Sequence, residues 1–359
     1  CFGCSTQKDA IPNRWYHQIN TKYNGLFYAK ENLKEGIKKI EESHKDNYKN
    51  TLRIYKYGEL KKIQGAKASL DLAIEKSTLA IQKHSMEIEG VEKNKLIDKN
   101  YMVIGVAKFY KQDYSAAKKT FEYLQKNSLE DDKKTEAMLW VARCNQELNK
   151  TESLTKNIRD LEEEFYLNKK QDAELDIIQS EKSIKEGYYV EAIDYLHKAN
   201  KKLSDKHKKT RIHYVLGQLY MRTNQPLKAL NQFNEVIKKN PNYEMVFNAK
   251  LNRAKTYTTD GKNFDELKKS LEKMLNDSKN EEYKDQIHFT LGGLQLLNKD
   301  TIGAIEQIKK SSQTSIYNTE QKIESHQKLA NIFWIKKEYV NAYNHSDTAY
   351  KLSNPQTPG

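Results

Sequence analysis

Glycine and proline are scarce in this sequence, with 14 Gly and 5 Pro among 359 residues. Both residues interrupt helices and mark the frequent turns of all-β proteins, so their scarcity argues against a strand-rich fold and favours helices. No apolar run approaches the roughly 18 residues that a membrane-spanning helix needs, and the mean hydropathy is −0.92. We therefore expect no membrane-spanning segment and a helix-rich chain with a large surface.

The sequence also lacks the motifs that carry enzyme chemistry. It has no Gly-rich phosphate loop, Gly-x-Ser-x-Gly elbow, calcium loop or His-Glu-x-x-His pattern. Its nine His are scattered singly, His84 falls at a predicted helix end, and residues 162–164, all Glu, are more typical of a solvated face than of a metal site. We predict no catalytic residue, no metal site and no cofactor apart from a covalent lipid.

Only three cysteines occur, and two of them, Cys1 and Cys4, lie at the start of the sequence. A first-residue cysteine followed by a polar, turn-prone stretch is typical of a lipoprotein, whose acyl chains contribute about 0.8 kcal/mol per buried methylene to membrane anchoring. The position of Cys1 favours it as the lipidated residue, whereas the small Gly3 before Cys4 is what a lipoprotein peptidase prefers. Cys144 is predicted to be a small core residue within a helix.

The net charge of +13 comes from 62 basic and 49 acidic residues that are interleaved along the chain. A basic stretch of this kind can bind nucleic acid or anionic lipid. Its Lys outnumber its Arg and no aromatic residues alternate with them, which favours a solvated loop and helix end and predicts no nucleic-acid partner. The densest basic stretch consists of Lys198, Lys201, Lys202, Lys206, Lys208, Lys209 and Arg211.

Internal repeats decide the expected architecture. Residues 213–242 contain Leu-Gly-x-x-Tyr, then Ala-x-x-x-Phe, then Pro, which is the tetratricopeptide pattern. In it, Gly217 lets two helices approach, Ala229 faces the gap, Phe233 fills the groove and Pro241 ends the second helix. Variants of the unit are marked by Gly105, Phe109, Tyr110, Ala117 and Phe121; by Ala192, Leu196 and Ala199; by Ala254, Tyr257, Leu267 and Leu271; by Gly292, Ala304 and Ile308; and by Ala330, Phe333, Ala342, Ser346 and Ala349.

The spacing predicts an all-α, tetratricopeptide-repeat, right-handed superhelical solenoid with a concave groove. Residues 1–12 are predicted to be a lipidated tether, residues 13–65 a helical hairpin (15–29 with 31–42) and a polar connector from residue 48, residues 66–352 the repeat array, and residues 353–359 a flexible tail. Between residues 137 and 165 the repeat spacing blurs, but two amphipathic helices are still expected.

Partner binding is predicted on the concave groove, to which the first helix of each hairpin contributes. Arg and aromatic residues are the usual anchors of an interface. For Tyr214 and Trp334, packing within the array is an equally good interpretation. The candidate partner-binding residues are Arg211, Tyr214, Gln218, Met221, Asn248, Lys255, Asn331 and Trp334.

Several segments resemble the PorW/SprE-type tetratricopeptide-repeat lipoproteins of the type 9 secretion and gliding-motility machinery. The resemblance covers roughly the first third of the chain and departs from the family pattern at residues 51–57. The segments are Cys4-Ser5-Thr6-Gln7-Lys8-Asp9, Asn20-Thr21-Lys22-Tyr23-Asn24-Gly25-Leu26-Phe27-Tyr28, Asp46-Asn47-Tyr48, Ala80-Ile81-Gln82-Lys83-His84-Ser85-Met86, and the repeat around Gly105 and Phe121.

The resemblance implies a lipid-anchored protein on the periplasmic face of the outer membrane. Such a protein would be a non-catalytic scaffold or adaptor that links the outer-membrane translocon to periplasmic ring subunits of type 9 secretion. The alternative is a repeat lipoprotein of outer-membrane protein assembly or peptide capture. Both interpretations predict protein partners and a lipid-mediated contact with the membrane.

Overall fold

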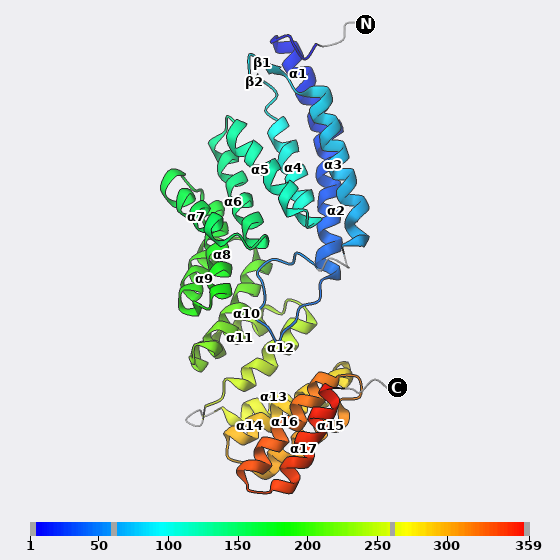
Figure 1. The fold of residues 1–359 in the computed structure, drawn as a ribbon, viewed down its shortest axis with the longest axis vertical. Coiled ribbons are helices and arrows are strands. Elements are labelled where there is room, and N and C mark those ends of the chain that lie inside the picture. Colours follow the sequence, from blue (N-terminus) through cyan, green and yellow to red (C-terminus); the bar gives the residue numbers. More distant parts are fainter. Residues whose placement is uncertain (1–4, 59–62, 259–262, 355–359) are drawn as a thin grey trace. The chain divides into compact units, whose positions relative to one another are not determined.

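The computed structural model describes residues 5–58, 63–258 and 263–354, and these residues are largely helical (Figure 1). The all-α prediction is therefore confirmed. The chain divides into two compact units, Cys1–Asp205 and Lys206–Gly359, called unit 1 and unit 2 below. Cys1 and Cys4 of the predicted tether and residues 355–359 of the predicted tail lie outside the described residues.

The described residues of unit 1 form a long N-terminal helical run, a helix that packs against it, an antiparallel β-ribbon of two strands with two residues each, and three helical hairpins. Its elements are α1 (Ile11–Asn20), the π-helical turn η1 (Thr21–Leu26), α2 (Phe27–Ser43), α3 (Gln64–His84), β1 (Glu87–Ile88), β2 (Val91–Glu92), α4 (Ile97–Tyr110), α5 (Tyr114–Asn127), α6 (Asp131–Glu147), α7 (Thr151–Glu164), α8 (Lys169–Glu186) and α9 (Tyr189–Lys202).

The described residues of unit 2 form four further hairpins, and the first helices α12, α14 and α16 lie next to one another in succession. Its elements are α10 (Lys206–Arg222), α11 (Pro226–Lys239), α12 (Tyr243–Lys255), α13 (Phe264–Leu275), the 3-10 helix η3 (Ser278–Tyr283), α14 (Lys284–Leu297), α15 (Thr301–Thr314), α16 (Thr319–Ile335) and α17 (Tyr339–Ser353).

The N-terminal residues 11–43 form one continuous helical run, so the hairpin predicted from residues 15–29 and 31–42 is wrong. Lys30, at the expected turn, is a good helix former and nothing there stops the helix. The run packs instead against α3, the helix that follows the connector in the sequence. Two glycines allow this approach, because a Cβ on Gly25 would lie 2.4 Å from the Cβ of Ala80, and one on Gly36 would lie 2.6 Å from a methyl carbon of Leu70.

In several hairpins, a small residue on the first helix meets a large apolar residue on the second helix. A Cβ added to Gly105 would lie 2.4 Å from the Phe121 ring, and one added to Gly217 would lie 2.6 Å from the Phe233 ring. The close contacts predicted at Gly105, Gly217 and Gly292 are therefore confirmed. The same 16-residue spacing occurs at Ala142 with Ile158 and at Ser180 with Leu196, whereas in the last hairpin the residue 16 positions after Ala330 is the exposed Ser346.

Candidate functional site

The candidate functional site is a groove in unit 2 where α12, α14 and α16 lie next to one another. It contains a cavity of about 340 Å³ with a mainly apolar lining and lysine side chains at its edge. Such a cavity is suited to a large apolar side chain of a bound segment, with acidic groups beside it. The lining residues are Lys255, Phe289, Thr290, Gly293, Leu294, Leu296, Leu297 and Lys328.

A glycine of α14, Gly293, lines the cavity. A Cβ added to Gly293 would meet no atom within 4 Å, so the missing side chain leaves open space in the groove. Phe289 and Leu296 pack against the buried residues between α14, α15 and α16, which fixes the apolar walls. Leu297, at the end of the same helix, is 42% exposed and offers apolar surface to solvent. The walls are therefore mainly apolar and packed against the core of this hairpin.

Three of the sequence-predicted residues lie on α12 and α16, two of the helices that form this groove. Lys255, the last residue of α12, lines the cavity directly. Asn331 and Trp334 are exposed on α16; Asn331 lies three residues after the cavity-lining Lys328 and is its neighbour on the helix surface, whereas Trp334 lies six residues after it, on another side of the helix. Trp334 is 65% exposed and its ring meets Tyr339 edge to face, so much of the indole remains available.

The other predicted residues lie on α10 and α12. Gln218 and Met221 are half-buried on α10. Asn248 is half-buried on α12, where its side-chain amide donates to the carbonyl of Glu244 at 2.9 Å. These three residues stay predictions as partner contacts.

Arg211 and Tyr214 are buried, which differs from the prediction that they face a partner. The Tyr214 ring packs edge to face on Phe233, and its hydroxyl accepts a hydrogen bond from the Asn252 amide at 2.8 Å. Tyr214 therefore joins α10 to α11 and α12, as the packing interpretation proposed. Its amphipathic pattern looks the same from sequence in either role.

Sequence reasoning missed Phe289, Gly293, Leu297 and Lys328. The signal that could have found them is the Gly292-Gly293 pair. The close contact between α14 and α15 requires only Gly292. The second glycine, Gly293, can therefore contribute to a different surface. Lys328 carries no such signal, because one lysine among many on a helical surface is ordinary.

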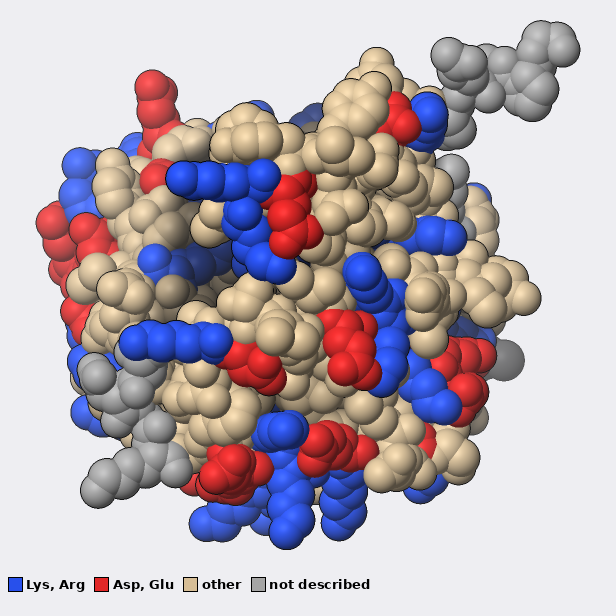
Figure 2. Space-filling model, turned by 90° about the horizontal axis from the view of Figure 1, so that it is seen from below, with Lys and Arg blue, Asp and Glu red and all other residues tan. Residues whose placement is uncertain are grey.

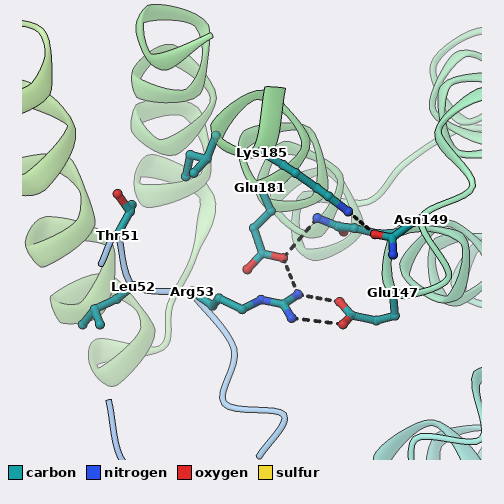
Figure 3. A pocket seen from close by; sticks show the side chains of 9 residues that line it. Thr51, Leu52, Arg53, Glu147, Asn149, Glu181 and Lys185 are labelled. Atoms are coloured by element: carbon teal, nitrogen blue, oxygen red, sulfur yellow. Dashed lines mark hydrogen bonds and ion pairs between the residues drawn. The ribbon is translucent and has the colours of Figure 1, made fainter. Parts of the chain in front are cut away.

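A second groove, in unit 1, is formed by α4, α6 and α8, and the connector runs along it. We call residues 48–58 the strap; they contain no helix or strand. Figure 3 shows Arg53 of the strap facing Glu147 of α6 and Glu181 of α8. Its Nη1 donates to Glu147 at 3.0 Å, and its Nη2 donates to Glu181 at 3.3 Å. These three residues line a cavity of about 290 Å³, to which Leu52 and Ile184 also contribute.

The strap also enters the core of unit 1. Tyr57 is buried, and its hydroxyl accepts a hydrogen bond from Nη1 of Arg143 at 2.9 Å. Arg143, itself buried on α6, forms an ion pair with Glu174 of α8, and its guanidinium lies 4.2 Å from the centre of the Tyr55 ring. The pKa of Tyr57 is raised because burial disfavours the phenolate. The polar connector of the sequence is thus largely an ordered part of the groove.

Side chains that could perform other chemistry are tied to structural partners. Cys144 is buried, and burial raises the pKa of its thiol to about 12. His84 and His17 are joined through their Nδ1 atoms at 2.9 Å, as are His326 and His345. Among the described residues, no group of three or more His, Cys, Asp or Glu side chains is placed to hold a metal ion.

The surface charges are mixed in sign. On the face drawn in Figure 2, Lys and Arg side chains are interspersed with Asp and Glu side chains. Within the basic stretch, Lys202 is paired with Asp172 at 2.8 Å and with Asp176 at 2.7 Å. This arrangement differs from the continuous basic surface that binds a nucleic-acid backbone. In the described part of the chain, no helix is both long and apolar enough to cross a membrane.

Comparisons with known proteins find similarity at the level of the fold. No protein-family model and no curated protein sequence matches the chain. Among solved structures, the apo form of RapI is 13% identical, with a TM-score of 0.52 over 80% of this chain and 77% of that chain. The C-terminal part of a TPR repeat-containing protein from Cytophaga hutchinsonii is 16% identical, with a TM-score of 0.49 over 74% of this chain and 99% of that chain.

The chain is an all-α solenoid of the tetratricopeptide-repeat type. Helical-repeat solenoids of this kind present extended concave surfaces that serve protein–protein interaction. The TPR protein YrrB, described as having an unusual peptide-binding site, is 14% identical, with a TM-score of 0.41 over 56% of this chain and 94% of that chain.

Proposed function

We propose that this protein is a non-catalytic adaptor that binds a segment of a partner protein in the groove of unit 2. The observation that carries the proposal is the apolar cavity between α12, α14 and α16, with Lys255 and Lys328 at its edge. An apolar side chain in the cavity would be desolvated against Phe289 and Leu297, and acidic side chains beside it would meet the ammonium groups.

The cellular setting we propose rests on the sequence resemblance and the N-terminal cysteines. In this proposal, Cys1 or Cys4 carries acyl chains and holds the protein on the periplasmic face of the outer membrane. Its partners are then the outer-membrane translocon and periplasmic ring subunits of type 9 secretion and gliding motility. Single and double Cys1→Ser and Cys4→Ser variants, with intact-mass analysis of the wild type, test the anchor. A protein without acyl chains whose double variant still fractionates with the outer membrane contradicts it.

Affinity purification from native membranes tests the partner site. We expect the Lys255→Glu/Lys328→Glu variant to lose the partner proteins that the wild type retains, with unchanged helicity by circular dichroism. The matched control is Lys238→Glu/Lys269→Glu, which changes the charge equally at exposed positions on α11 and α13.

The identity of the captured proteins tests the proposed cellular setting. Translocon and ring subunits support the proposed setting, whereas unfolded β-barrel proteins support the assembly alternative. Full retention of partners by the Lys255→Glu/Lys328→Glu variant contradicts the unit 2 groove as the binding site.

A further inference from the structure

The strap has the form of a peptide bound in the groove of unit 1. The first helices of successive repeats build the surface that solenoids use for extended ligands, and here α6 and α8 contact a segment without helix or strand. The contacts join residues about 90 to 130 positions apart in the sequence, such as Arg53 with Glu147 and Ile54 with Glu181. The strap therefore reaches the groove as a separate segment would.

Alternate strap residues carry the recognition. Arg53, Tyr55 and Tyr57 all meet side chains of α6 or α8, while the backbone bends at residues 54–55 and the side chains of Leu52 and Ile54 are buried. Arg53 is held by two carboxylates, the Tyr55 hydroxyl donates to Glu174, and the Tyr57 hydroxyl accepts from Arg143. The backbone amide of Ile54 also donates to Glu181 at 3.1 Å. The groove thus recognises an Arg-x-Tyr-x-Tyr pattern by both side chains and backbone.

Stacking of the same side chains adds to this recognition. The Tyr55 and Tyr57 rings are stacked, with centroids 5.8 Å apart and planes inclined by 8°. The guanidinium of Arg53 lies 4.9 Å from the centre of the Tyr57 ring, and that of Arg143 lies 4.2 Å from the centre of the Tyr55 ring. Cation–π contacts of this kind strengthen when they are shielded from water. Two arginines, one from the strap and one from α6, therefore enclose the pair of tyrosines.

The charge of the groove explains why it needs a cationic ligand. Glu147 and Glu181 both contact one guanidinium, so without Arg53 two carboxylates would face the same space and repel each other. Glu174 is the third carboxylate, and Arg143 of the groove itself already compensates its charge. A segment that lacks an arginine at the first position of the pattern would leave the repulsion between Glu147 and Glu181 in place.

We infer that the strap is a built-in ligand of the unit 1 groove, and that an outside protein segment with an Arg-x-Tyr-x-Tyr pattern binds the same groove when the strap leaves it. The groove is distinct from the unit 2 cavity of the proposed function. A tethered ligand has an effective concentration in the millimolar range. The strap therefore keeps weakly binding segments out of the groove and admits only a segment that binds tightly or displaces it.

The test measures the binding of a fluorescently labelled peptide with the sequence of residues 48–58. Its partners are the wild-type chain and the Arg53→Glu/Tyr55→Ala variant, whose strap no longer carries the pattern. We expect the variant to bind the peptide at least about tenfold more tightly than the wild type. A peptide with Glu at the Arg53 position, and a variant that also carries Glu147→Gln and Glu181→Gln, should bind weakly. Equal binding by wild type and variant, or no binding by a folded variant, overturns the inference.

Hydrogen exchange of the wild-type chain decides the question even if the strap variant fails to fold. A replaceable strap opens without unfolding α6 and α8, so the amides of residues 53–57 should exchange clearly faster than the central amides of these helices. Exchange of the strap only together with α6 and α8 would show that it leaves the groove by global unfolding alone, and would overturn the inference.

Discussion

Two adjacent glycines of α14 provide a matched pair of alanine substitutions. Gly292 and Gly293 lie in the interior of the same helix, so alanine gains about 1 kcal/mol of helix propensity at either position. A Cβ at position 292 would lie 2.6 Å from Cγ1 of Ile308 and 3.0 Å from the carbonyl oxygen of Ala304. A Cβ at position 293 would meet no atom within 4 Å. The difference between the two variants therefore isolates the cost of the close contact.

The expected magnitudes follow from this geometry. Overpacking of a core costs about 1–3 kcal/mol, and the backbone oxygen of Ala304 cannot rotate away as a side chain could. With an overpacking cost of about 2 kcal/mol and a propensity gain of about 1 kcal/mol, we expect Gly292→Ala to lower the free energy of unfolding by about 1 kcal/mol. Gly293→Ala should raise it by about 0.5–1 kcal/mol.

Urea unfolding followed by circular dichroism, with hydrogen exchange of the α14 and α15 amides, measures the two values. Hydrogen exchange is needed because repeat arrays can unfold in parts, and the global transition then averages over several hairpins. If Gly293→Ala destabilises the protein as much as Gly292→Ala does, the contact between Gly292 and Ile308 does not control the packing of this hairpin. Gly293→Ala also places a methyl group in the unit 2 cavity, so it should weaken partner binding while the fold stays intact.

Three further predictions concern buried polar groups. Replacing Arg143 with Met removes the cation beside the Glu174 carboxylate and should destabilise unit 1 by about 3–5 kcal/mol in urea unfolding; a loss below 1 kcal/mol would contradict a buried ion pair. Burial lowers the pKa of His345, and the neighbouring His326 adds to this effect, so the stability that the neutral ring contributes is present above the ordinary pKa near 6.5 and is lost as the pH falls below it. His345→Gln supplies the residue type that contacts the equivalent histidines of earlier repeats, Gln232 beside His213 and Gln307 beside His288, and should flatten this pH dependence of stability. The raised pKa of Cys144 predicts that iodoacetamide near pH 8 leaves its thiol unmodified in the native protein but alkylates it in urea, as peptide mapping by mass spectrometry can show.

The repeat pattern made most of the fold predictable from sequence. The sequence revealed where two helices approach at Gly217 with Phe233 and at Gly105 with Phe121. In both cases the small and the large residue lie within one hairpin and within a short stretch of sequence. The N-terminal region was harder. There the partner of the helical run is α3, which follows only after the connector, and the sequence analysis placed a turn at Lys30 although its helix propensity favours the continuous helix that is observed.

The two grooves were predictable to different extents. Lys255, Asn331 and Trp334 could be placed on first helices by counting from the small repeat residues Ala254 and Ala330. The burial of Tyr57 could not be foreseen, since its neighbour in the core, Arg143, lies 86 residues later and no local pattern marks the connection. From sequence alone, a connector rich in Lys and Tyr is expected to be exposed to solvent. Only the positions of the helices that receive its aromatic rings show that it is partly buried.

In the last hairpin, the first helix carries a larger residue than glycine at the contact position, and the second helix carries a smaller residue than Phe or Ile. Ala330 stands where α4, α10 and α14 have glycine, and Ser346 stands where their partner helices have Phe or Ile. A graft of α16 alone in place of α10 would bring the alanine methyl group against the Phe233 ring, and a graft of α17 alone in place of α11 would leave a void beside Gly217. Engineering that shortens, extends or recombines this protein therefore has to move whole hairpins, with each small residue and its large counterpart transferred together.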